Sequence, residues 1–186
     1  LLSLLGLPYK KIPVDMLQNE HKDPEYLKLS PLGQVPTLVD GDTVITDSTA
    51  ALVYLALEHG DERWLPRNPA GAARVQRWLS TASGELYRGP VQARSAKKWQ
   101  RDVDYPRAVQ WAERLFRWME SELAGRTWLA ADHPTIADVA MYSSRSTARY
   151  SVVGIPSSVQ TSWKRMSPPL APPASPTAPC GMRSSS

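Results

Sequence analysis

A chain of 186 residues, 42% of them hydrophobic, is long enough for one or two domains with a buried core. No apolar run approaches the ~20 residues that a membrane-spanning helix needs. The net charge is +4, but all 18 acidic residues lie at or before Asp138, and only five of the 22 basic residues follow it. The body of the chain is therefore nearly neutral, which argues against a nucleic-acid-binding face.

The first third of the chain alternates short helical and short extended segments. Leu1–Leu5 is typical of the last turns of a helix, with Gly6 as its stop. Tyr9–Val14 is an extended segment, and its internal proline suits only an edge strand. Asp23-Pro24 then predicts the cap and first position of a short helix.

A β-hairpin is predicted next. Thr37–Asp40 and Thr43–Thr46 are rich in strand-forming residues, and Gly41-Asp42 supplies a two-residue turn between them. Asp47-Ser48 starts a helix that stops at Gly60. The order helix, strand, helix, strand, strand, helix indicates an incomplete α/β unit.

The apolar spacing in residues 64–142 is helical throughout. Asn68-Pro69 starts a helix that reaches about Leu86, and Tyr105-Pro106 starts a second, antiparallel to the first. A third begins at Thr135–Asp138, where the threonine hydroxyl and the aspartate carboxylate can each accept the other's backbone N–H in a capping box. This region is predicted to be an all-helical domain.

The composition changes abruptly at Ser143. Residues 143–186 hold seven of the 17 prolines and no acidic residue. We interpret this stretch as a disordered Ser/Pro-rich tail or as the result of a shift in reading frame after Tyr142. The chain thus divides into 1–61, 64–142 and 143–186.

Two short stretches could carry chemistry. An X-Pro bond such as Val35-Pro36 can be cis and expose a backbone N–H and C=O pair that holds an extended, peptide-like ligand, although an ordinary turn is the alternative. Asp47-Ser48 offers a helix N-terminus to a carboxylate and an aspartate to an ammonium group, although a simple helix cap is the alternative. The single cysteine, Cys180, excludes a disulfide framework and a cysteine-based zinc site, and we expect no metal.

Three motifs in order, Ser30–Leu38, Asp47–Leu55 and Thr135–Ala140, make the chain similar to the cytosolic glutathione transferase family, of the bacterial type. The resemblance covers residues 1–142. It implies a fold that is α/β plus all-α: a thioredoxin-like glutathione-binding domain followed by a helical domain. Its first strand, with the Ser, Tyr or Cys that stabilises the glutathione thiolate, is expected upstream of Leu1, and Ser3 is not a candidate for that role.

The family's glutathione contacts map onto matching positions. The resemblance implies that the backbone of Val35 holds the cysteinyl part, that Asp47 faces the γ-glutamyl ammonium and that Ser48 faces its carboxylate. The implied glutathione-binding set is His21, Gln34, Val35, Pro36, Asp47 and Ser48. Within it, Gln34 neighbours the tripeptide and His21 lies where family members contact the glycine end.

The implied activity is glutathione S-transfer to an electrophilic, hydrophobic substrate. A non-catalytic binding module and a glutathione-dependent disulfide or peroxide reductase are the alternatives. The resemblance implies a cytoplasmic homodimer, with the helix that contains Val75 as a candidate interface, and helices near Arg77 to Gln110 around the second substrate. A basic run, Arg94 to Arg101, is interpreted as a solvated helix face, with contact to an anionic substrate as the alternative.

Overall fold

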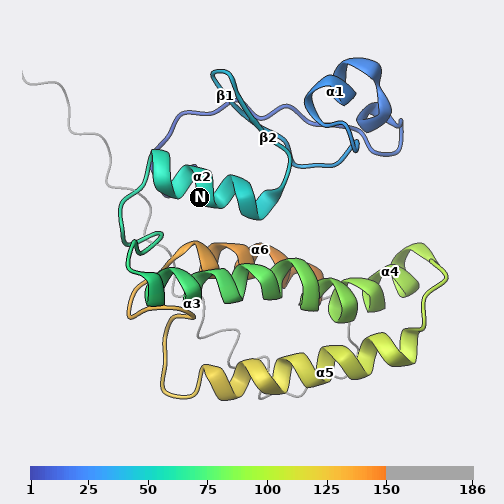
Figure 1. The fold of residues 1–186 in the computed structure, drawn as a ribbon. Coiled ribbons are helices and arrows are strands. Elements are labelled where there is room, and N and C mark those ends of the chain that lie inside the picture. Colours follow the sequence, from blue (N-terminus) through green and yellow to red (C-terminus); the bar gives the residue numbers. More distant parts are fainter. Residues whose placement is uncertain (150–186) are drawn as a thin grey trace, which may run out of the picture.

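The computed structural model describes residues 1–149, and side chains as far as Tyr142. Its elements are η1 (Glu20–Lys22), α1 (Pro24–Leu29), β1 (Leu38–Asp40), β2 (Thr43–Ile45), α2 (Ser48–Glu58), α3 (Pro69–Ser80), η2 (Thr81–Glu85), η3 (Tyr87–Val91), α4 (Gln92–Trp99), α5 (Tyr105–Glu122) and α6 (Ile136–Arg149). The hairpin, α1 and α2 form a small N-terminal part that lies over a layer of helices (Figure 1). The expected division into an α/β part and a helical part is therefore present.

The predicted hairpin is confirmed. β1 and β2 pair antiparallel with Leu38 opposite Ile45 and Asp40 opposite Thr43. Gly41 has a φ of +56°, a left-handed conformation that glycine adopts without steric cost, so it allows the tight turn.

The predicted edge strand at Tyr9–Val14 is wrong. In the described part of the chain, the sheet consists of β1 and β2 alone, and this segment runs without strand pairing. Extended backbone becomes a strand only when a neighbour supplies ladder hydrogen bonds, and the internal proline has no N–H to donate. Leu1 does begin a helical turn, because its carbonyl accepts the amides of Leu4 (2.8 Å) and Leu5 (3.0 Å).

The first long helix extends beyond its predicted end. Helical backbone continues from α3 through η2 and η3 into α4, so it reaches Trp99 instead of stopping near Leu86. Both η2 and η3 are π-helical turns, which widen a helix by one residue and accommodate Pro90 without an i→i−4 hydrogen bond. Apolar periodicity did not reveal this continuation, because a π turn shifts the buried face.

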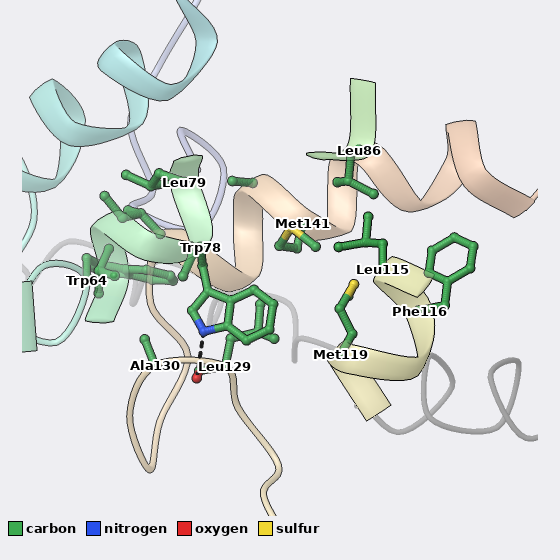
Figure 2. Packing of buried hydrophobic residues seen from close by; sticks show 14 of the residues in the cluster. Trp64, Trp78, Leu79, Leu86, Leu115, Phe116, Met119, Leu129, Ala130 and Met141 are labelled. Carbon is green, nitrogen blue, oxygen red and sulfur yellow. Dashed lines mark hydrogen bonds between the residues drawn. The ribbon is translucent and has the colours of Figure 1, made fainter. Parts of the chain in front are cut away.

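The hydrophobic core lies among the helices. Trp78, Leu86, Phe116 and Met119 are each at most 2% exposed, and the Trp78 indole donates a hydrogen bond of 3.0 Å to the Leu129 carbonyl (Figure 2). These tryptophan and apolar positions match the packing role expected from their helical spacing. The core thereby holds α3, α5 and the segment before α6 together.

The third predicted helix is α6, with the expected cap. The Asp138 carboxylate accepts the Thr135 amide at 2.8 Å, while the Thr135 hydroxyl accepts the Ala137 amide at 3.3 Å rather than that of Asp138. The helix continues to Arg149, so the expected boundary at residue 142 falls inside it. The rest of the predicted Ser/Pro-rich tail, 150–186, lies outside the described residues.

A polar cluster joins the hairpin to α2. The Asp40 Oδ2 atom accepts the Tyr54 hydroxyl at 3.0 Å and lies 2.7 Å from His59 Nε2. These hydrogen bonds, first that from His59 and then that from Tyr54, lower the pKa of Asp40. The cluster therefore favours the ionised carboxylate in the folded state.

The pH dependence of stability should show this cluster. Because the pKa of Asp40 is lower in the folded than in the unfolded chain, its stabilising effect is present above the unfolded value of about 3.9 and is lost as the pH falls through the folded value. Asp40→Asn should therefore lower the urea midpoint at pH 6 and lose this effect towards pH 3. Asp42→Asn is the control, since this carboxylate of the same turn has no hydrogen bond or ion pair among residues 1–142. A pH-independent difference between Asp40→Asn and the parent chain would contradict the assignment.

Candidate functional site

The loop before β1 has a fixed backbone. The fully buried Ser30 hydroxyl accepts the Gln34 amide at 3.0 Å and donates to the Gln34 carbonyl at 3.1 Å. The Tyr26 hydroxyl of α1 donates to the same carbonyl at 2.7 Å. The Val35–Pro36 peptide that follows is cis, and Val35 is 44% exposed. The structure therefore presents Val35 at the surface on an anchored loop.

Gly33 brings His21 to this loop. Its φ is +61°, and a Cβ at this position would lie 2.6 Å from the His21 carbonyl oxygen, so only glycine permits this approach. The backbone of His21 thus lies against the residue that precedes Gln34. The His21 Nδ1 atom is buried and has no hydrogen-bond partner among the described residues.

Asp47 caps α2. Its Oδ1 atom accepts the amides of Thr49 (2.9 Å) and Ala50 (2.7 Å) and the Thr49 hydroxyl (2.6 Å). These hydrogen bonds, with that of the Thr49 hydroxyl the strongest contributor, lower the pKa of the Asp47 carboxyl. Oδ2 of Asp47 and the hydroxyl of the exposed Ser48 have no hydrogen-bond partner within the described part of the chain. The capping interpretation is thus confirmed, and one oxygen of the carboxylate stays open.

The hairpin joins the two stretches. Its last pair, Leu38 opposite Ile45, lies two residues after Pro36 and two residues before Asp47. The anchored loop and the N-terminus of α2 therefore meet at the open end of the hairpin, away from the Gly41 turn. This end combines a partial positive charge from the helix with the negative Asp47, which suits a ligand that carries both an ammonium and a carboxylate group.

Two supporting residues were missed in the sequence. Tyr26 anchors the Gln34 carbonyl from eight residues away, and Ser30 holds both backbone groups of Gln34. Neither contact follows from helical or strand periodicity, since both depend on how α1 packs against the loop. A buried serine three residues before a glycine in the left-handed region is the one local signal for such a turn.

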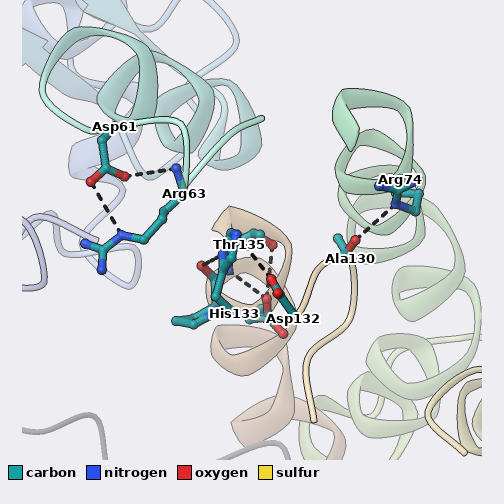
Figure 3. A network of polar contacts seen from close by, with 9 residues as sticks. Asp61, Arg63, Arg74, Ala130, Asp132, His133 and Thr135 are labelled. Carbon is teal, nitrogen blue, oxygen red and sulfur yellow. Dashed lines mark hydrogen bonds and ion pairs between the residues drawn. The ribbon is translucent and has the colours of Figure 1, made fainter. Parts of the chain in front are cut away.

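A separate hollow of about 530 Å³ lies between the segment that links α2 to α3 and the loop before α6. Among its lining residues, Arg63 pairs with Asp61 at 3.4 Å and Arg74 donates to the Ala130 carbonyl at 3.2 Å (Figure 3). The His133 Nε2 atom lies 3.6 Å from Asp132 Oδ1. Each of these three side chains already has a partner beside it, so the hollow is not the candidate site.

The described residues contain neither a metal-binding cluster nor a membrane-spanning helix. No group of three or more His, Cys, Asp or Glu side chains there could hold a metal ion. None of the helices in that part of the chain is long and apolar enough to cross a membrane.

Comparison with known proteins places this architecture. Residues 1–58 match the family described as glutathione S-transferase, N-terminal domain. Glutathione S-transferase theta-2 from Homo sapiens is 30% identical over 150 residues, which cover 72% of this chain and 59% of that protein. The chain therefore spans less than two thirds of the length of this relative.

Solved structures show the same fold. A glutathione transferase homologue from Drosophila mojavensis with bound glutathione superposes with a TM-score of 0.79 at 26% identity, covering 89% of this chain and 77% of that chain. A glutathione S-transferase from Pseudomonas fluorescens gives a TM-score of 0.78 at 26% identity, over 88% and 84% of the two chains.

These observations define a protein with a thioredoxin-like N-terminal domain and a helical C-terminal domain, as the sequence predicted. The chain is thus similar to glutathione S-transferases, and the N-terminal domain of that family is matched over residues 1–58.

Proposed function

We propose that the protein binds glutathione at the open end of the hairpin and transfers it to an electrophilic, hydrophobic substrate. The thiolate of glutathione forms a C–S bond with an electrophilic carbon, and the leaving group departs with the electrons of the bond that breaks. The hairpin register, whose outermost pair lies two residues from both Pro36 and Asp47, carries this proposal. The glutathione bound to the Drosophila mojavensis relative supports the choice of ligand.

Each proposed contact uses a group that the fold leaves open. The free Oδ2 atom of Asp47 faces the γ-glutamyl ammonium, and the Ser48 hydroxyl at the N-terminus of α2 receives the adjacent carboxylate. The exposed backbone of Val35 and its neighbour Pro36 holds the cysteinyl part. Gln34 borders the tripeptide.

The far end of the tripeptide completes the proposed site. The glycine carboxylate reaches His21, whose buried Nδ1 lacks a partner among the described residues.

Asp47→Asn tests the charge of this site apart from its structural role. Asparagine is as good a helix cap as aspartate, so α2 keeps its start while the attraction for the ammonium group is lost. We expect glutathione affinity, measured by calorimetry, to weaken by about 1–3 kcal/mol in Asp47→Asn and in Ser48→Ala.

Asp104→Asn is the matched control, because Asp104 caps α5 in the same way, accepting the Arg107 amide at 3.1 Å, and lies outside the proposed site. Equal affinities in all four proteins would reject the site. Affinity that depends on Asp47 without conjugation of an aryl halide would support a binding module instead, and reduction of a glutathione mixed disulfide would support a reductase.

Similarity to glutathione S-transferases supports two further proposals, a cytoplasmic location and a homodimer. Val75 itself is fully buried in the core, so it is excluded as a contact in any such interface. The exposed side of α3, which includes Gln76 and Arg77, is the part of that helix open to a partner.

A further inference from the structure

The helical run that ends in α4 carries an unbalanced positive charge. Between Glu85 and Asp102 the sequence has no carboxylate and five cations: Arg88, Arg94, Lys97, Lys98 and Arg101. Among the described residues, none of the five forms an ion pair. The negative end of the helix dipole accounts for cations in the last turn, Lys97 and Lys98, but not for the others.

Three of these cations lie over two aromatic rings. The Arg94 guanidinium and the Lys98 ammonium lie 5.2 Å and 5.3 Å from the centroid of the Trp99 ring, and Lys97 lies 4.9 Å from that of Tyr105. Two cations on one ring lie within about the Debye length of 10 Å at 0.1 M salt, so they repel each other. An anion bound between them would remove this repulsion.

Two further observations indicate a ligand here. The Arg94 Nε atom is buried and has no hydrogen-bond acceptor within the described part of the chain. Trp99 is 53% exposed, which leaves ring surface for stacking. In a ligand that combines an aromatic ring with a carboxylate, the carboxylate pairs with the cations and the ring stacks on Trp99.

The position of α4 suits a second substrate. In Figure 1 the N-terminal end of α2, where glutathione is proposed to bind, faces the side of the molecule on which α4 lies.

We propose that α4 and the first residue of α5 form a subsite for an aromatic carboxylate, so that the second substrate is an anionic aryl electrophile; this rests on the proposed glutathione transfer. With an aryl chloride, the glutathione thiol releases its proton to solvent, the thiolate forms the C–S bond, and chloride leaves with the electrons of the C–Cl bond. Arg94 and Lys98 hold the carboxylate, and Trp99 stacks on the ring.

Two probes of nearly equal shape test the subsite without glutathione, so that no reaction occurs. 4-Chloro-3-nitrobenzoate is anionic, and 4-chloro-3-nitrobenzamide is neutral. In calorimetry at about 20 mM salt we expect the benzoate to bind roughly tenfold more tightly, and the difference to fall below about twofold at 500 mM, where the Debye length is about 4 Å.

Single substitutions show which residues cause the tighter binding of the benzoate. Arg94→Gln and Lys98→Gln should each weaken benzoate binding by about threefold to tenfold and leave benzamide binding unchanged, while Lys98→Arg should keep benzoate affinity. Arg117→Gln is the matched control, since it removes one charge from an exposed position of α5 outside the subsite.

Equal affinities for the two probes, or the same loss in Arg117→Gln as in Arg94→Gln, would overturn the subsite. A glutathione titration on the same protein separates the two proposals. Discrimination between the probes without glutathione binding would retain the subsite and reject the transferase function. Glutathione binding without discrimination between the two probes would retain the transferase function and reject the subsite.

Discussion

Gly89→Ala should lower the free energy of unfolding by about 3 kcal/mol, because it forces two closely packed helices apart. A Cβ at Gly89 would lie 2.8 Å from the Ala112 amide nitrogen and 3.0 Å from the Ala112 Cα, both backbone atoms of α5. Backbone atoms cannot rotate away as a side chain can, so η3 and α5 must separate and the core between them loosens. The loss should appear as a lower midpoint in urea unfolding.

Gly84→Ala is the matched control for this effect. Gly84 lies in the same helical run, and a Cβ there would meet nothing within 4 Å. Alanine at an open helical position reduces the entropy of the unfolded chain, so we expect no loss and a gain of up to about 1 kcal/mol. If the two alanine variants were equally stable, the close approach of η3 to α5 would be refuted.

Asp138→Ala should cost about 3 kcal/mol, through hydrogen bonds rather than packing. The Asp138 carboxylate accepts the Leu129 amide at 3.0 Å, the Thr135 amide at 2.8 Å and the Thr135 hydroxyl at 3.0 Å. Leu129 and Thr135 are buried, so alanine leaves two amides without an acceptor and without water. Chemical denaturation at pH 7 measures the loss.

Burial of the Asp138 carboxylate limits the stability that is lost in Asp138→Ala. It raises the pKa of Asp138 even though the Leu129 and Thr135 hydrogen bonds lower it, which shows that the ionised carboxylate is held at a desolvation cost. Removing the carboxylate relieves that cost, and the expected loss is therefore smaller than the sum of three charged hydrogen bonds. Asp138→Asn keeps one acceptor oxygen, so its stability should lie between those of the parent chain and Asp138→Ala. An alanine variant as stable as the parent would show that these amides have other acceptors.

The features that the sequence predicted correctly are local. The Gly41-Asp42 turn and the caps at Asp23, Asp47 and Asn68 each depend on a few neighbouring residues, and the structure confirms them. The wrong strand at Tyr9–Val14 shows the opposite case, because strand formation depends on a neighbour that local sequence does not contain.

Within the candidate site, too, the sequence predicts the local features and misses those that depend on tertiary packing. Val35-Pro36 and Asp47 stand out by residue type, and the hairpin between them implies that they meet. The hydrogen bonds of Tyr26 with Gln34 and of His59 with Asp40 span 8 and 19 residues. They arise from tertiary packing, which periodicity does not encode.

The segment that links α2 to α3 makes contacts with both domains. The Trp64 carbonyl accepts the Ile136 amide at the start of α6 at 3.0 Å, and the Trp64 side chain is buried in the same core as Ala56 of α2. Loss of this region on either side exposes apolar surface on the other, so we expect the two domains to unfold in one cooperative transition. The proposed glutathione site would therefore be held rigid in part by helices of the other domain.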